Sequence, residues 1–322
     1  MRDRIDRRQF LLGVLGAATA GVVAGCTKGG RAPAVAKSAA GGATELPPAG
    51  PSRLMIASGN GKSPAALTRA AIEEAGGIRK FVHKGATVVI KPNIAWQRRP
   101  EQAATTNPQI VTEVARMCRE AGAREVTVLD HVIDQPTRLV LEVSGLGEAA
   151  RAGGAEVMAI ELSDSPRLYR EIEIPRGKVL TSEQVVSKVL DADVLINLPI
   201  AKQHGGSILT LSMKNLMGII WNRQGWHQRD LHQCIADFST AVRPHLIVMD
   251  AVRILTSSGP KGPGDTKDVG QVIVGTDPVA MDAYSATLFG MQGAQIPHIA
   301  QAAQLGVGRI DLAKVKLQHV AA

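Results

Sequence analysis

Aromatic residues are scarce in this sequence, and several short catalytic motifs are missing from it. Phe, Trp and Tyr make up 3% of the chain, whereas hydrophobic residues of all kinds make up 45%. The core must therefore be built mainly from Val, Ile, Leu and Ala, a composition typical of a mostly parallel sheet covered by helices. The sequence contains no P-loop, no His-Glu-x-x-His zinc helix and no Gly-x-Ser-x-Gly nucleophile turn. These absences argue against kinase and hydrolase functions.

Cysteine is rare as well, with three residues in the chain. Cys118 and Cys234 stand among apolar residues at helical spacing, so we expect both in the core, where free cysteine is common. A disulfide between them is an alternative without support in the sequence. An iron–sulfur cluster requires several closely spaced cysteines. The sequence has no such run, so no iron–sulfur cluster is expected.

Positive charge exceeds negative charge. The chain has 37 Lys and Arg against 29 Asp and Glu, a formal net charge of +8. Four arginines and two aspartates among the first eight residues supply +2 of this, which leaves about +6 for the rest. A basic protein body favours an anionic ligand or anionic lipid. No basic run is interleaved with aromatic residues, so we expect no nucleic acid partner.

The amino-terminal end resembles an export signal rather than part of the fold. Arg7 and Arg8 precede a Phe and a short apolar run, the pattern of a twin-arginine signal, with Asp6 where Ser or Thr is usual. The apolar run, residues 10–24, is shorter than the roughly 20 residues that a transmembrane helix needs. It leads into Val-Ala-Gly-Cys, a sequence similar to a bacterial lipobox, which would make Cys26 the acylated first residue.

These signals predict a cellular location and a domain organisation. Residues 1–26 are interpreted as the signal, 27–50 as a flexible tether rich in Gly, Ala, Pro and Lys, and 51–322 as a single α/β domain. We expect a protein exported by the twin-arginine route, periplasmic or on the cell surface, and held to the membrane by lipid on Cys26. A plain amino-terminal anchor helix is the alternative. Export of an already folded chain would permit a cofactor to be loaded first.

Short apolar runs alternate with amphipathic stretches along the body. Strands are predicted over Arg53–Ala57, Thr87–Ile90, Glu125–Leu129, Glu156–Glu161, Val194–Leu198, His245–Met249, Gln271–Gly275 and Lys314–His319. Helices are predicted to begin at Pro64, Pro108 and Pro278, each after a capping Ser, Asn or Asp. The alternation predicts an α/β fold with a mostly parallel sheet and helices on both faces, of the doubly wound type.

Four less regular segments complete the predicted elements. A weaker helix is expected over about 136–152, interrupted by Gly145 and Gly147. A small hairpin is expected around Gly177, with strands 171–175 and 178–180. A capping box of Thr181 and Gln184 predicts a helix to Leu190. Residues 207–220 are predicted to be helical.

Polar side chains follow four of the predicted strands, where open α/β sheets bind ligands. The side chains thought to hold an anionic or carboxylate ligand are Lys91, Asn93, Asn197, Lys202, Lys214 and Asn215. The candidate general acid–base groups, or ligands of a divalent metal ion, are Asp130, His204 and Asp250. His131 is a weaker candidate beside Asp130. Gly205 and Gly206 would let backbone amides approach a ligand near His204.

Each candidate also has a structural interpretation. Asp130 and Asp250 can cap loops, asparagines can satisfy turns, and Lys214 can snorkel to the surface. Asp277 is interpreted as a helix cap, and Asp282 as structural. The segment 221–232, with its Trp and His residues, is either a lid over the site or an exposed loop.

Six stretches, read together, resemble one family of proteins, domain of unknown function 362. They are VVIKPNIAW (88–96), TTNPQIVTEVARMCREAGA (105–123), DADVLINLPIAKQH (191–204), LSMKNLMGII (211–220), VRPHLIVMDAV (242–252) and VGTDPVAMDA (274–283). The family has Lys-Thr-His where this chain has Gln203 between Lys202 and His204, and it often has Gly-Asp-Ser around the position of Asp130. Some members carry a ferredoxin-type cysteine cluster, which this chain lacks.

The resemblance implies an α/β fold and, for some members, a redox or metal setting. Two classes of function follow from all these observations. The first is an enzyme-like or metal-dependent site at the strand ends that takes a small anion. The second is a non-catalytic lipoprotein that captures a solute or a partner protein at the membrane surface.

Overall fold

The computed structural model describes residues 52–59, 61–161 and 166–321, and every element given below lies in these ranges. The predicted signal, Cys26 and the whole of the predicted tether lie outside the described residues. The described residues belong to one unit by their internal contacts. None of the helices in the described ranges is long and apolar enough to span a bilayer.

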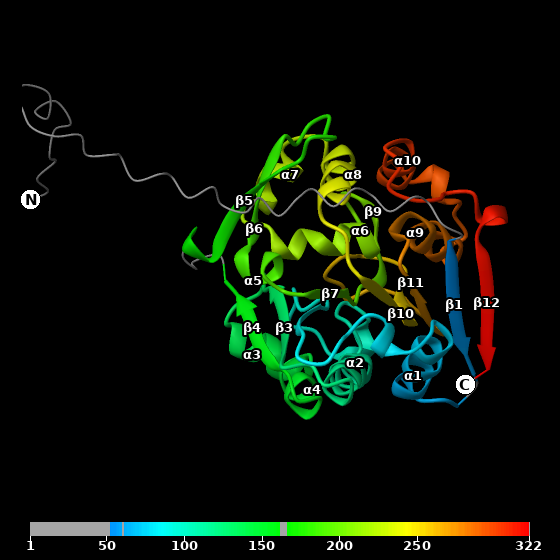
Figure 1. The fold of residues 1–322 in the computed structure, drawn as a ribbon. Helices are drawn as coiled ribbons and strands as arrows, with labels where there is room; N and C mark the ends of the chain where they lie inside the picture. Colours follow the sequence, from blue (N-terminus) through cyan, green and yellow to red (C-terminus); the bar gives the residue numbers. More distant parts are fainter. Residues whose placement is uncertain (1–51, 60, 162–165, 322) are drawn as a thin grey trace, which may run out of the picture. The chain divides into compact units, whose positions relative to one another are not determined.

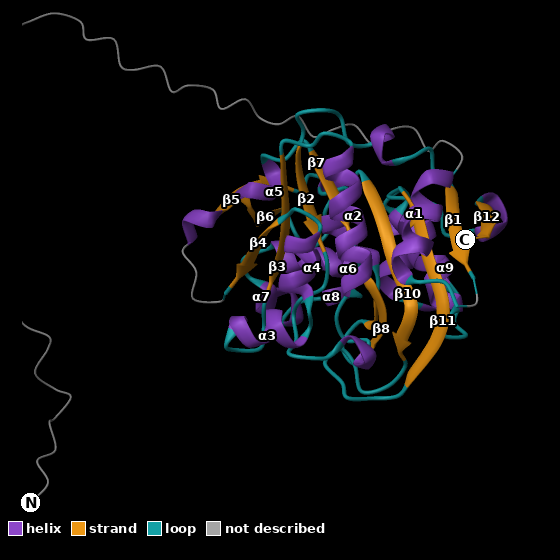
Figure 2. Cartoon of the chain, turned by 90° about the horizontal axis from the view of Figure 1, so that it is seen from below, coloured by secondary structure: helices purple, strands orange, loops and turns teal. Residues whose placement is uncertain are grey.

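One sheet of ten strands organises the fold (Figure 2). The strands are β1 (Arg53–Ser58), β2 (Thr87–Lys91), β3 (Glu125–His131), β4 (Glu156–Ile160), β7 (Val194–Asn197), β8 (Ile200–His204), β9 (Ile208–Thr210), β10 (Leu246–Leu255), β11 (Thr266–Gly275) and β12 (Lys316–Ala321). Their order is β12-β1-β11-β10-β7-β2-β3-β4, with β8 beside β10 and β9 beside β8. Only β11 and β9 run antiparallel to their neighbours. The predicted mostly parallel sheet is therefore confirmed.

Helices cover both faces of this sheet (Figure 1). They are α1 (Pro64–Glu74), α2 (Pro108–Glu120), α3 (Thr137–Val143), α4 (Leu146–Ala152), α5 (Ser187–Leu190), α6 (Ser212–Asn215), α7 (Arg223–His227), α8 (Leu231–Ala241), α9 (Pro278–Thr287) and α10 (Pro297–Gln304). Short 3-10 turns are η1 (Ile78–Lys80), η2 (Pro100–Gln102), η3 (Pro166–Leu168), η4 (Leu216–Ile219), η5 (Gly293–Gln295) and η6 (Leu312–Lys314). In Figure 1, α1 to α4 lie on one side of the sheet and α6, α8, α9 and α10 on the other.

The three predicted proline-capped helix starts are confirmed. Ser63 accepts a hydrogen bond from the amide of Ala66 at the start of α1, and Asn107 accepts one from Gln109 at the start of α2. At α9 the Asp277 carboxylate accepts from two amides of the first turn. Each such cap contributes about 1 kcal/mol and fixes where the chain leaves the preceding loop.

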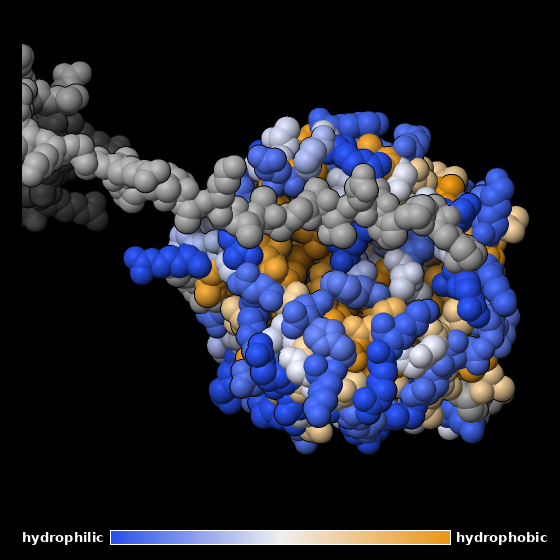
Figure 3. Space-filling model, in the orientation of Figure 1, coloured by the Kyte–Doolittle hydropathy of each residue, from blue (hydrophilic) through white to orange (hydrophobic). Residues whose placement is uncertain are grey.

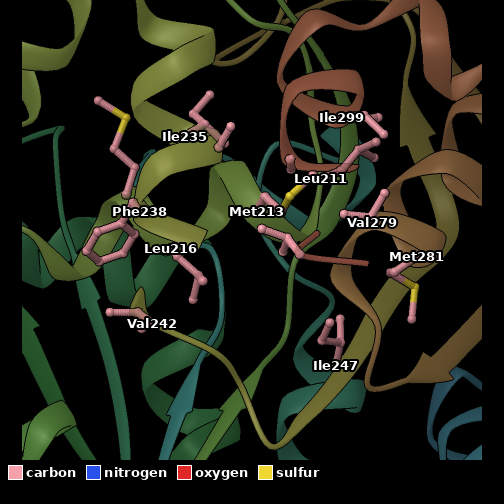
Figure 4. Close-up of a cluster of buried hydrophobic side chains, with 14 of the residues drawn as sticks. Leu211, Met213, Leu216, Ile235, Phe238, Val242, Ile247, Val279, Met281 and Ile299 are labelled. Carbon is pink, nitrogen blue, oxygen red and sulfur yellow. The ribbon is translucent and has the colours of Figure 1, made fainter. Parts of the chain in front are cut away.

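The core lies in two apolar layers, one on each face of the sheet. Successive strand residues alternate between them, as Val88 and Val89 do in β2. Figure 4 shows the layer that packs α6 and η4 against α8, α9, α10 and β10, with Phe238 at the left and Ile247 near the bottom. Cys118 and Cys234 are buried free thiols in opposite layers, which confirms their predicted core positions. In Figure 3, apolar residues gather in a hollow near the centre of an otherwise hydrophilic face.

Three predicted elements are corrected. The hairpin pairs β5 (Tyr169–Glu173) with β6 (Ser182–Val186), so the predicted helix at 181–190 is a strand followed by the four-residue α5. Helix 136–152 is two helices, because Gly145 adopts a positive φ of 70° between them. The predicted helix at 207–220 is β9, α6 and η4 in succession. This broken segment is the part of the chain that crosses the candidate site.

Candidate functional site

The strand order brings most of the predicted site residues to one edge of the sheet. Lys91 ends β2 and lies opposite Asn197, the last residue of β7. Asp130 stands near the end of β3, the other neighbour of β2. Lys202 and His204 belong to β8, which continues the sheet beyond β7 along β10. The carboxyl ends of these parallel strands therefore converge, as the sequence predicted.

Asn215 of α6 ties these strand ends together. Its side-chain oxygen accepts hydrogen bonds from Lys91 Nζ and Asn93 Nδ2, both at 3.0 Å. Its Nδ2 donates to the Lys91 carbonyl at 3.2 Å and to Asn197 Oδ1 at 2.8 Å. The Asn197 amide in turn donates to the Ser212 carbonyl at 2.9 Å. All four hydrogen-bonding positions of the Asn215 amide are used within the protein, so Asn215 positions the site rather than contacting a ligand.

Lys91 and Asp130 form a buried ion pair with 2.8 Å between Lys91 Nζ and Asp130 Oδ1. Asp130 Oδ2 also accepts from the Ile94 amide at 2.7 Å. Burial lowers the pKa of Lys91, and Asp130 opposes that effect. Gly218 of η4 packs directly on this pair: a Cβ there would lie 1.9 Å from Asp130 Oδ1 and 2.7 Å from Lys91 Nζ. Only glycine fits this position, which sequence reasoning did not single out.

Lys202 is as buried as Lys91 but forms no ion pair with the described residues. Its Nζ donates to Asn93 Oδ1 at 3.0 Å and to the Ala104 carbonyl at 2.5 Å. Both partners are neutral. Burial and the charges of Lys214 and Lys91 hold the pKa of Lys202 well below its ordinary value, although Asp130 raises it.

Lys214 has even less compensation for its charge. Its hydrogen-bond partner within the described chain is the Met217 sulfur, 3.0 Å from Nζ, and sulfur is a weak acceptor. Burial, then the charges of Arg223 and Lys91, lower the pKa of Lys214 to about 7. With 8% of its surface exposed, Lys214 is buried and does not snorkel to bulk water. It is nevertheless more exposed than Lys91 and Lys202, which are each 1% exposed.

Asp282 of α9 fixes the backbone that carries Lys214. Its two carboxylate oxygens accept from the amides of Ser212 at 2.7 Å and Met213 at 3.1 Å, at the start of α6. Asp282 is buried, and burial raises its pKa to about 8. The structural interpretation of Asp282 agrees with these bonds. Since α6 is held at its first turn by Asp282 and at its last residue by Asn215, the Lys214 backbone has little freedom to move.

The segment 221–232 contributes two side chains to the same region. Arg223 and His227 lie on α7, which is held in place by buried Trp226, whose Nε1 donates to Glu183 at 2.6 Å. Burial lowers the pKa of Arg223, and Asp130 raises it. Arg223 Nε is buried and has no hydrogen-bond partner in the described part of the chain. Sequence reasoning missed Arg223, because nothing in its flanking residues indicates that α7 folds back over the strand ends.

His204 is held as a neutral ring. Its Nδ1 accepts from the amides of Gly206 at 2.9 Å and Ser207 at 3.2 Å, so the ring hydrogen is on Nε2. Burial, with Lys214 and Lys202 nearby, lowers its pKa to about 3. The His227 ring stacks on it at 6.2 Å between centroids. The glycine turn therefore presents Gly206 to the imidazole, and His204 can donate one hydrogen bond from Nε2.

A pocket of ≈ 680 Å³ opens beside His204. Its lining also includes Gln203, Thr256 and Lys267, with an apolar side formed by Leu288, Phe289 and Met291. Lys91, Lys202 and Lys214 are not in this lining. His204 lines the pocket and is also near enough to Lys214 and Lys202 for their charges to lower its pKa.

The predicted metal ligands do not come together as a set. Asp130 pairs with Lys91, and Asp250 accepts from the amides of Asn107 at 2.8 Å and Val252 at 3.1 Å. Burial raises the pKa of Asp250 to about 7. Within residues 52–59, 61–161 and 166–321, no group of three or more His, Cys, Asp or Glu side chains is arranged to hold a metal ion. The arrangement of Asp130, His204 and Asp250 thus gives the metal prediction no support, and Asp250 acts as a loop and helix cap.

The charges of the region do not balance. Four basic side chains, Lys91, Lys202, Lys214 and Arg223, are linked by electrostatic effects, and the Asp130 carboxylate acts on three of them, Lys91, Lys202 and Arg223. Asp250 and Asp282 bind backbone amides instead. We call these four basic residues with Asp130 the cationic cluster.

Comparison with other proteins places the chain in a family. A family model described as a domain of unknown function (DUF362) matches residues 88–287. The curated thylakoid-associated protein sll1697 of Synechocystis sp. is 26% identical over 261 residues, which cover 75% of each chain.

Two solved structures show a similarity to this chain. One is a protein from Thermotoga maritima, with a TM-score of 0.42 and 8% identity over 77% of this chain and 60% of that one. The other is the lactate racemase apoprotein from Thermoanaerobacterium thermosaccharolyticum, with a TM-score of 0.42 and 12% identity over 70% and 54%. The chain thus spans between half and two thirds of the length of these two structures. Because the family match covers more than half of the sequence, this chain belongs to the DUF362 family, as the six stretches indicated.

Proposed function

We propose that this chain binds a small anion, such as a carboxylate or phosphate, at the cationic cluster. The observation that carries the proposal is the excess of buried basic side chains over Asp130. A buried charge without a partner costs several kcal/mol, and an anion entering the cluster would offset that cost. Lys214 and Arg223 are the ligand contacts, because the Lys91 ammonium is already shared with Asp130 and the Lys202 ammonium with Asn93 and Ala104.

His204 supports the same assignment. An imidazole that is neutral and carries its hydrogen on Nε2 is a donor, and a donor suits an anionic oxygen. Lys214 and Arg223 then offer two cationic groups and His204 one neutral donor, and among the described residues the carboxylate that acts on Arg223 is Asp130. A metal ion would meet unfavourable charge there, whereas an anion meets complementary charge.

We also propose that the chain works outside the cytoplasm as a lipoprotein, exported through its twin-arginine signal and anchored at Cys26. The signal pattern and the lipobox in the sequence support this address. The name of the Synechocystis relative, a thylakoid-associated protein, agrees with a membrane association. A tethered domain with an anion site would capture a small solute close to the membrane surface.

Calorimetric titration tests anion binding directly. The full chain, purified in detergent, is titrated with oxalate and with inorganic phosphate at pH 6.5, where Lys214 is protonated. Arg223→Gln removes one proposed contact, and we expect it to weaken binding at least tenfold, about 1.4 kcal/mol. Lys84→Met is the matched control, because this exposed lysine precedes β2 and lies at the opposite edge of the sheet. Absence of binding by the unmodified chain, or equal affinities in all three proteins, would refute the proposal.

A further inference from the structure

We propose that Lys214 is a nucleophile that condenses with the carbonyl carbon of a 2-oxo-carboxylate bound at the cationic cluster, forming an imine. This inference rests on the proposed anion site and assigns it a substrate class. It depends on three features of the site: where Lys214 is held, which groups surround its nitrogen, and which ligand group the neighbouring cations would bind.

Lys214 is the least committed amine of the three buried lysines. Lys91 is committed to Asp130, Pro92 and Asn215, and Lys202 to Asn93 and Ala104, by bonds of 2.5 to 3.0 Å. Lys214 contacts the Met217 sulfur and keeps 8% exposure, against 1% for each of the others. Its backbone is fixed through the bonds from α6 to Asp282 and Asn215. Among the described residues its hydrogen-bond partner is this weakly accepting sulfur, so Lys214 is a positioned amine whose nitrogen is less committed than those of Lys91 and Lys202.

The groups around this amine are cationic. Arg223 and Lys91 act on it through their charges, and no carboxylate contributes to its pKa. An amine that is desolvated and placed next to other cations is kept partly unprotonated and so can attack a carbonyl group. Its pKa of about 7 agrees with this arrangement.

The same cations define the substrate class. Arg223 lies near enough to Lys214 for its charge to lower the pKa of that lysine, so a carboxylate bound by Arg223 would bring its neighbouring carbon toward Lys214. If that carbon is a carbonyl, as in a 2-oxo-carboxylate, the anion site and the nucleophile act on adjacent atoms of one small molecule. His204 Nε2 can donate a hydrogen bond to the carbonyl oxygen, because its ring is held neutral by Gly206 and Ser207.

The condensation balances without an oxidant or reductant. The neutral Lys214 nitrogen forms a bond to the carbonyl carbon, and the carbon–oxygen π pair moves to the oxygen. The two amine hydrogens leave with that oxygen as water, and the nitrogen and carbon share a double bond in the imine. One amine and one oxo acid give one imine and one water.

Reductive trapping tests the proposal. The purified full chain is incubated with pyruvate or glyoxylate and cyanoborohydride at pH 7.5, and peptides are mapped by mass spectrometry. We expect one reduced adduct, located on Lys214 and formed at least tenfold faster than any adduct on Lys84, an exposed lysine. Oxalate, which is an anion of similar size without a ketone or aldehyde, should block this adduct and leave adducts on exposed lysines unchanged.

The outcomes separate this inference from the anion site. Adducts spread over exposed lysines, with none on Lys214, would overturn the nucleophile assignment even when oxalate still binds in calorimetry. Absence of both oxalate binding and the Lys214 adduct would overturn the anion site as well. Lys214→Arg provides a second measurement, because it retains the positive charge but cannot form an imine under these conditions. We expect it to lose the mapped adduct, and a reduced adduct that persists in the same peptide would overturn the assignment.

Discussion

Replacing Lys214 by methionine should stabilise the unliganded protein, against the usual effect of substitutions in a buried site. Methionine has a similar length and volume and needs no charged partner. In the folded protein the pKa of Lys214 falls from an ordinary value of 10.5 to about 7. Protonated Lys214 therefore opposes folding, because the folded state binds its proton less strongly than the unfolded chain does.

The magnitude follows from the two pKa values. One pKa unit corresponds to about 1.4 kcal/mol, so the full effect at pH 6 is on the order of 5 kcal/mol. Local relaxation and water penetration reduce the cost of a buried ion. We therefore expect Lys214→Met to raise the free energy of unfolding at pH 6 by at least ~2 kcal/mol. The gain should be smaller at higher pH.

The sign of this pH dependence is fixed by linkage. Between pH 7 and 10.5 the unfolded chain holds the Lys214 proton and the folded protein does not, so the wild-type protein becomes more stable as the pH rises. The advantage of the methionine variant should thus shrink by up to about 1.4 kcal/mol per pH unit in this window. Taking the difference between the two proteins removes the contributions of all other titrating groups that the substitution leaves unchanged.

Urea denaturation of both proteins at pH 6, 7, 8 and 9 measures this difference. Lys84→Met is the control, and its stability relative to wild type should be the same at each pH. Two results would refute the reasoning about Lys214. One is a methionine variant less stable than wild type at pH 6. The other is a stability difference that stays constant from pH 7 to pH 9.

Four further predictions concern the same region. Gly218→Ala should destabilise the fold by about 3 kcal/mol, since its Cβ would overlap Asp130 and Lys91, whereas Gly205→Ala, with no atom within 4 Å of its Cβ, should be near neutral in the same urea assay. Asp282→Ala leaves two amides of α6 unpaired and should cost about 3 kcal/mol, measured by thermal unfolding. Oxalate affinity should fall at least about tenfold from pH 6 to pH 9 as Lys214 loses its proton, and unchanged affinity would exclude its ammonium from binding. Calorimetry in EDTA should give the same oxalate affinity as calorimetry without EDTA. Loss of oxalate binding in EDTA would indicate that a metal ion takes part in the site.

Much of the sheet could be predicted from the sequence because its signals are local. Runs such as Val88–Ile90 are short, apolar and bounded by polar residues, and caps such as Asn107 precede a proline at the helix start. The convergence of Lys91 and Asn197 followed from the rule for parallel strands. The antiparallel insertion of β11 between β1 and β10 could not be predicted from the sequence. The position of β11 depends on which edges of the other strands are still unpaired when β11 joins the sheet, and no local sequence pattern predicts this.

The segment 207–220 explains why the site itself was harder to predict. Its apolar spacing suits a helix, but Asn215 bonds to residues of two strands, and Asp282 binds the amides of Ser212 and Met213. These long-range bonds outweigh the propensity for one continuous helix, so the segment is divided into a strand, a four-residue helix and a 3-10 turn. In this arrangement Lys214 is buried. The unusual position of this lysine in an apolar stretch was therefore the sequence signal for the site, and its chemical meaning depended on Arg223 and Gly218, whose roles are visible only in three dimensions.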